Sequence, residues 1–189
     1  MRSALTRSAL TRSALVCALL FCVGPTALLA GEDNPFKKAK VGDWVEHKMT
    51  GLDVGGTTKM TIVAKDDKEV TYEIKPTFSF MGKDMTGPVQ TQKIDLTKNY
   101  DLIAAANEKQ VNLKREKLAE GAEKIKIAGK ELETKWTHLK ITVTVNGMLM
   151  VSEYKMWFSK DVPVNGLVRM DTEVGTTKTR LELTGWGSK

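Results

Sequence analysis

Apolar and polar residues alternate along most of the chain between residues 43 and 184. Met60 and Ile62 share one side of an extended segment, whereas Lys59 and Thr61 share the other. A period of two is typical of β-strands that bury one face and expose the other to water. The pattern therefore predicts a protein built mainly from antiparallel strands.

The first two predicted strands cover residues 57–65 and 70–80, joined by a polar turn at Asp66-Asp67-Lys68. Pro76 interrupts the second strand. Because proline has no backbone N–H to donate to a neighbouring strand, this position predicts an edge strand, a bulge or a bend.

Asn146-Gly147, between two alternating apolar runs, is the strongest turn signal in the chain. A two-residue turn of this type fixes the register of a hairpin. It pairs Val145 with Met148 and, further along, Lys140 with Glu153. Opposite charges directly across a strand pair contribute roughly 0.2 to 1 kcal/mol to stability. Here the charged pair and the apolar pairs indicate the same register.

Further strands are predicted at residues 43–50, 89–96, 124–127, 132–139, 167–174 and 177–186. A change in the apolar parity near His138 predicts a bulge in the strand over 132–139. Residues 97–120 contain no glycine or proline and many Ala, Leu, Lys and Glu residues, which favours helix. The fold class is therefore α+β and mainly antiparallel β: a curved sheet or incomplete β-barrel with a helical insertion near residues 97–120.

Residues 1–30 resemble a secretory signal peptide. Arg2, Arg7 and Arg12 come first, residues 14–23 are apolar, and Ala30 offers a small residue for cleavage. An organelle transit peptide is the alternative, since such leaders are also rich in Arg and Ser. The domain organisation is then a leader at residues 1–30 and one β-rich domain at 31–189, exported to the periplasm or secreted. A small residue does not precede Cys17 or Cys22 as a lipoprotein signal requires, so we expect a soluble product.

Composition narrows the class of function. The 189 residues carry a formal net charge of +6, but three of the 29 basic residues and none of the 23 acidic ones lie in the leader, which leaves +3. Basic and acidic side chains are then mixed along the strands, which argues against a nucleic-acid partner. Both cysteines lie in the leader, so the mature chain has no thiol for a disulfide or a metal. It also has no apolar run long enough to span a membrane.

No catalytic, metal or cofactor motif stands out. The two histidines, His47 and His138, have no zinc or catalytic spacing. A hydrolase would require one of them to meet a carboxylate, such as Glu46 or Glu153, in a cleft. We therefore predict no enzymatic activity, no catalytic residue and no cofactor.

Methionine is unusually frequent in the strands. Flexible methionine side chains adapt to irregular apolar partners, so a sheet face rich in methionine is a candidate site for a hydrophobic small molecule. The same residues could equally fill an ordinary core. The candidate ligand-binding residues are Met148, Met150, Met156, Trp157 and Met60.

One segment carries a resemblance. The run Trp157-Phe-Ser-Lys-Asp-Val-Pro-Val-Asn-Gly-Leu-Val-Arg169, preceded by Lys126-Ile-Ala-Gly-Lys-Glu-Leu132, resembles exported bacterial proteins of unknown function over residues 120–185. More remotely, the order of strands and helix is similar to the half-barrel of periplasmic lipoprotein carriers. The first resemblance implies an exported protein, and the second implies an apolar ligand by architecture alone.

Three hypotheses follow. The first is an exported, non-enzymatic domain that binds a hydrophobic ligand or an envelope protein. The second is a structural or assembly module that acts through an exposed sheet edge, for which a long edge strand without charges or proline would be the signature. The third is a hydrolase.

Overall fold

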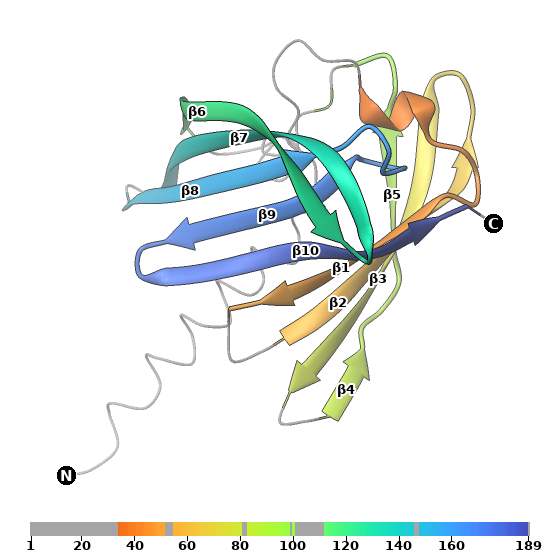
Figure 1. The fold of residues 1–189 in the computed structure, drawn as a ribbon, viewed down its shortest axis with the longest axis horizontal. Helices are drawn as coiled ribbons and strands as arrows, with labels where there is room; N and C mark the ends of the chain where they lie inside the picture. The colour runs from red at the N-terminus through yellow and green to blue at the C-terminus, as the bar shows by residue number, and fades with distance from the viewer. Residues whose placement is uncertain are drawn as a thin grey trace.

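The computed structural model describes residues 34–51, 55–80, 83–98, 100, 112–145 and 148–188. These residues form one short 3-10 helix and ten strands (Figure 1). The elements are η1 (Pro35–Lys38), β1 (Trp44–Thr50), β2 (Gly55–Lys65), β3 (Glu69–Phe80), β4 (Lys83–Thr86), β5 (Gln90–Asp95), β6 (Asn112–Ile127), β7 (Lys130–Val145), β8 (Met148–Phe158), β9 (Leu167–Val174) and β10 (Thr177–Gly187). The predicted leader, residues 1–30, lies outside the described residues.

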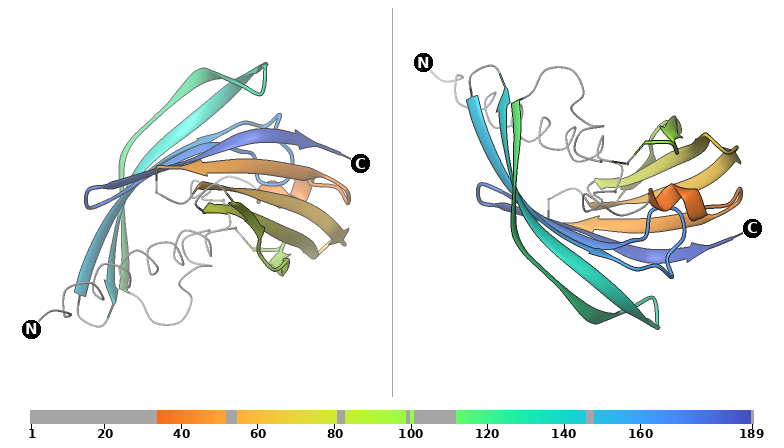
Figure 2. Two further views of the ribbon diagram at one scale, coloured as in Figure 1. Left: turned by 90° about the horizontal axis from the view of Figure 1, so that it is seen from below. Right: turned by 90° about the horizontal axis from the view of Figure 1, so that it is seen from above.

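All ten strands belong to one antiparallel sheet in the order β4-β3-β2-β1-β10-β9-β8-β7-β6, with β5 following β4 along the same edge of β3. Among the described residues β6 pairs only with β7, and β4 and β5 pair only with β3, so the sheet is curved but not closed. Figure 2 shows how steeply β6 and β7 cross the direction of β1 and β10. The first and last strands, β1 and β10, lie side by side in the middle of the sheet.

The hairpin register predicted from the turn signal is confirmed. Val145 pairs with Met148, and Lys140 pairs with Glu153, in an uninterrupted ladder that continues to Lys135 and Phe158. Residues 146–147 themselves lie outside the described residues. The strands predicted at 43–50, 89–96, 167–174 and 177–186 correspond to β1, β5, β9 and β10 with small shifts at their ends.

The helical insertion predicted over residues 97–120 is wrong where the structure describes it. Residues 112–120 belong to β6, which pairs with β7 along its whole length; residue 99 and residues 101–111 lie outside the described residues. Helix propensity is a weak local preference, and a ladder to a neighbouring strand overrides it. Gly121 lies within β6, where Trp136 of β7 covers it so closely that an added Cβ would meet the indole ring at 2.8 Å.

The bulge expected near His138 is present, but its extra residue belongs to the other strand. Lys117 pairs with Leu139 and Ala119 pairs with His138, so Leu118 of β6 has no partner in β7. Pro76 pairs with Thr58 of β2, and its carbonyl accepts a hydrogen bond from Gly87 between β4 and β5. The missing N–H of Pro76 therefore lies in the gap between the segments of β3 that pair with β5 and with β4.

The larger buried cluster lies under η1 and includes residues from every described strand except β4. Phe36 of η1 is fully buried and stacks on Tyr72 of β3, with ring centroids 5.6 Å apart. Asn34 caps η1 by accepting a hydrogen bond from the Phe36 amide. The sequence did not predict this short helix.

Candidate functional site

The strands β7 to β10 carry two different faces, because alternate side chains point to opposite sides of a sheet. One face is apolar. Its centre is a second buried cluster, around which further apolar side chains of the same face are only half-buried. The buried residues are Ile141, Met156, Leu167 and Met170, and the half-buried ones are Tyr100, Leu139, Val143, Tyr154, Phe158 and Leu181.

The structure brings two of the five candidate ligand-binding residues to this face. Met156 is buried at its centre, and Met150, opposite Val143, is half-buried. Met60 belongs instead to the larger cluster under η1. Trp157, at the alternate position on β8, is also buried in the larger cluster, and its indole N–H donates to a carboxylate oxygen of Glu123 on β6. The side chain of Met148 lies outside the described part of the chain.

His47 lies on the apolar side of β1, fully buried. Its Nε2 is 3.0 Å from the carbonyl oxygen of Leu167, and since a carbonyl only accepts, this nitrogen carries the hydrogen. Burial lowers the pKa of His47 from 6.5 to about 4, partly opposed by that hydrogen bond. His47 is therefore a neutral structural donor at physiological pH.

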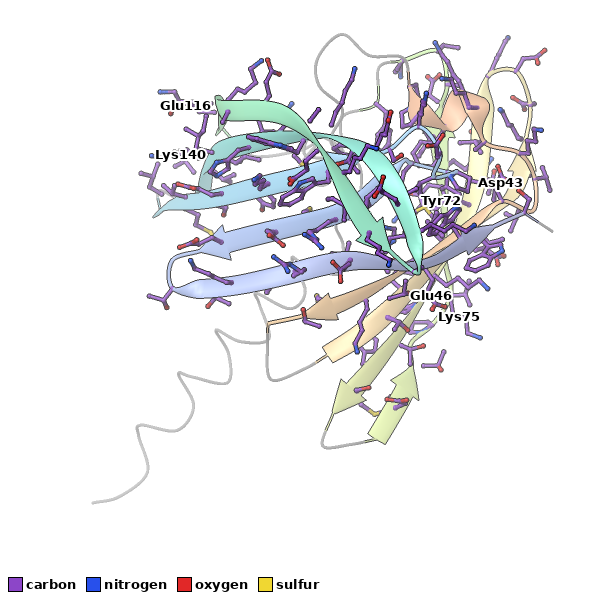
Figure 3. All side chains as sticks on the ribbon, in the orientation of Figure 1. Asp43, Glu46, Tyr72, Lys75, Glu116 and Lys140 are labelled. Atoms are coloured by element: carbon purple, nitrogen blue, oxygen red, sulfur yellow. The ribbon has the colours of Figure 1, made fainter. Side chains whose placement is uncertain are left out.

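The opposite face of the same strands is charged and contains a cleft of about 450 Å³. Polar side chains on this face form cross-strand rows, one of which includes Glu116, Lys140 and Glu153. Figure 3 shows Glu116 and Lys140 at the end of β6 and β7 that is remote from Tyr72. The cleft is lined by Thr50, Gly51, His138, Glu153, Lys155, Asp171, Thr172, Glu173, Lys178, Thr179 and Arg180.

Each carboxylate that lines the cleft has a basic partner. Arg180 holds Asp171 through two parallel hydrogen bonds of 2.7 and 2.8 Å, and this contact raises the pKa of the Arg180 guanidinium. Lys178 approaches Glu173 to 3.1 Å. These contacts are largely open to solvent, so each contributes little to stability.

His138 meets Glu153 in the cleft, with 3.0 Å between Nε2 and a carboxylate oxygen. This is the meeting that the hydrolase hypothesis required, and the hairpin register would have placed the two residues within two positions of each other. Along the described chain, however, no serine, threonine or cysteine forms a hydrogen bond with His138. His138 and Glu153 thus supply a base and a carboxylate that orients it, but no nucleophilic side chain of the described residues contacts the base. His47, in contrast, points away from its neighbour Glu46.

Lys155 differs from the other bases of the cleft. Its ammonium lies over two indole rings, 4.1 Å from the centroid of Trp136 and 4.8 Å from that of Trp157. Among the described residues it forms no ion pair with a carboxylate. Sequence reasoning did not single out Lys155 or Trp136, although extending the hairpin register places Lys155 opposite His138 and Trp136 opposite Trp157.

Two further features, a metal site and a membrane-spanning helix, are absent from the described residues. They contain no cluster of three or more His, Cys, Asp or Glu side chains suited to a metal ion. Nor does any helix in these ranges have the length and hydropathy needed to cross a membrane.

Two solved structures are similar to the chain, at low sequence identity. One is a presumed exported protein with a YmcC-like fold from Bacteroides fragilis, at 9% identity and a TM-score of 0.48, covering 81% of this chain and 99% of that one. The other is a presumed lipoprotein from Parabacteroides distasonis, at 10% identity and a TM-score of 0.49, covering 82% and 100%. No protein-family model and no curated protein matches the sequence.

Proposed function

We propose that this chain is an exported, non-enzymatic domain that binds a hydrophobic ligand, of the class of a long acyl chain, on the apolar face of β7 to β10. The observation that carries the proposal is the half-buried apolar rim around Met156 and Met170 on an unclosed sheet. Export is supported by the leader-like residues 1–30.

The rim has the properties that an acyl chain needs. Its side chains remain partly in contact with water, so covering them removes apolar surface from solvent at roughly 25 cal/mol per Å². The two methionines beneath can adjust their rotamers to a flexible chain. Thr137, a polar residue on this face opposite Met156, is already buried and therefore need not be desolvated on binding.

The experiment is a titration of the detergent-free protein, purified from an exporting host, with saturated fatty acids of increasing length. Each added CH₂ contributes about 0.8 kcal/mol when buried, so the dissociation constant should fall about fourfold per methylene until the face is covered. Native mass spectrometry with organic extraction would show in parallel whether a lipid copurifies.

Two matched variants distinguish binding at this face from non-specific hydrophobic binding. Val143→Glu places a charge on the apolar face of β7 and should weaken acyl binding at least tenfold. Val151→Glu places the same charge on the opposite face of β8, where the side chain is already exposed, and should leave binding unchanged. Equal loss in both variants, or no dependence on chain length, would refute the proposal.

The edge-strand alternative gains no support from the described edge β6. It is 16 residues long. Its N-terminal half, however, is rich in charged side chains, which include Lys114, Arg115, Glu116 and Lys117. Charges on an edge oppose pairing with another strand.

A further inference from the structure

We propose that the charged cleft on the other face of β7 to β10 is a binding site for a small hydroxylated organic anion, whose carboxylate or phosphate group is held by Lys155. This site is separate from the acyl face, because Lys155 and Met156 are consecutive residues of β8 and point to opposite sides of the sheet. Anion binding in the cleft therefore does not depend on acyl binding on the other face.

Lys155 has no carboxylate partner in the described part of the cleft. Three carboxylates line the same cleft, yet each is taken by another base: Asp171 by Arg180, Glu173 by Lys178, and Glu153 by His138. An ammonium group has three N–H donors. The ammonium of Lys155 is thus left with two aromatic faces and no anion among the described residues.

The ammonium of Lys155 is held in place by the two indole rings. Trp136 packs on Gly121, where the absence of a side chain lets the ring lie close to β6, and Trp157 is fixed by its hydrogen bond to Glu123. The two rings form a platform that positions the ammonium at the cleft wall before any ligand arrives. A group ordered in advance loses less entropy on binding, and charge-assisted hydrogen bonds are the stronger kind.

The other walls of the cleft fit the remainder of the ligand. The other walls offer both acceptors and donors, since the carboxylates keep free lone pairs and the Arg180 guanidinium keeps N–H groups that Asp171 does not use. Such a mixed lining fits hydroxyl groups, which donate and accept. A volume of about 450 Å³ is within the ordinary range for small-molecule sites.

The test is a titration followed by the indole N–H signals of the four tryptophans in NMR spectra of isotopically labelled protein. The probes are glucuronate, which carries a carboxylate, glucose 6-phosphate, which carries a phosphate, and neutral glucose. We expect saturable shifts of Trp136 and Trp157 but not of Trp44, with at least one acid binding tenfold or more tightly than glucose. The acid that binds more tightly identifies the oxyanion.

Lys155→Met removes the ammonium and should weaken binding of that acid at least tenfold, whereas Lys155→Arg should retain most of it. The matched control is Lys59→Met. Lys59 also lies over an indole, 4.2 Å from the centroid of Trp44, but does not line the cleft, so its loss should not change binding. The proposal is overturned if neither acid gives a saturable shift, if glucose binds as tightly as the acids, or if Lys155→Met, folded by the same spectra, binds like the wild type.

Discussion

At the scale of single residues, His47 shows how burial decides the role of a side chain. The sequence offers an imidazole that could act as a base or a ligand, but the structure buries it completely beside Leu167. Its pKa of about 4 keeps it neutral over the physiological range. The chemistry of a histidine is thus set by its surroundings rather than by its presence in the sequence.

This burial predicts acid sensitivity. Above pH 6.5 His47 is neutral in both the folded and the unfolded chain, so its stabilising contribution is complete. Between pH 6.5 and pH 4 the unfolded chain takes up a proton that the folded protein does not, which lowers the free energy of unfolding by roughly 3 kcal/mol across the window.

Urea unfolding at pH 7.5 and at pH 4.5 measures this loss. His47→Gln keeps an N–H donor near the Leu167 carbonyl but does not titrate, so the difference between the two pH values should shrink by most of that amount. An unchanged difference would show that other groups cause the acid sensitivity.

At the scale of elements, β6 is where local preference and the observed structure disagree. Its Ala, Leu, Lys and Glu residues favour helix by themselves. Pairing with β7, interrupted only at Leu118, is a non-local interaction that helix propensity does not include. Once the segment is a strand at an edge, the same lysines and glutamates protect it from pairing with another chain.

Removing this protection should promote self-association. We expect the double variant Lys114→Val and Glu116→Val, which leaves the net charge unchanged, to elute earlier than the wild type in size-exclusion chromatography with light scattering, increasingly so at higher concentration. The comparison is Lys59→Val on β2 together with Glu73→Val on β3, because both residues have a paired strand on each side. If both variants associate equally, exposed hydrophobicity rather than the free edge is responsible.

At the scale of the whole molecule, the position of β1 beside β10 joins two halves of the sheet. Strands β2 to β5 continue from one side of this junction, and β6 to β9 from the other. Leu183 of β10 pairs with His47 at the junction and is buried in the larger cluster. The stability of each half therefore depends on the same central pair of strands.

Leu183→Ala should consequently destabilise both halves together, by about 2 to 5 kcal/mol, as buried leucine truncations do. Hydrogen exchange read by mass spectrometry reports this directly: protection in β2 and β3 and protection in β7 and β8 should fall by similar factors. Loss confined to one half would mean that the halves unfold independently.

The sequence by itself determined most of the strands, though not β4 or the first part of β6, and it determined the register of the β7–β8 hairpin. These depend on period-two alternation and on Asn146-Gly147, which are local, and the extended register already pairs Trp136 with Trp157. Only the tertiary structure decided that residues 112–120 form an edge strand, that β1 joins β10, and that Met60 and Met156 belong to different clusters. Those outcomes depend on contacts between residues far apart in the chain, for which alternation along one strand carries no information.

The cleft also depends on contacts between distant residues, because its wall residues come from β1, β7, β8, β9 and β10. That Lys155 has no carboxylate partner among the described residues is apparent only when the partner of every carboxylate in the cleft is known.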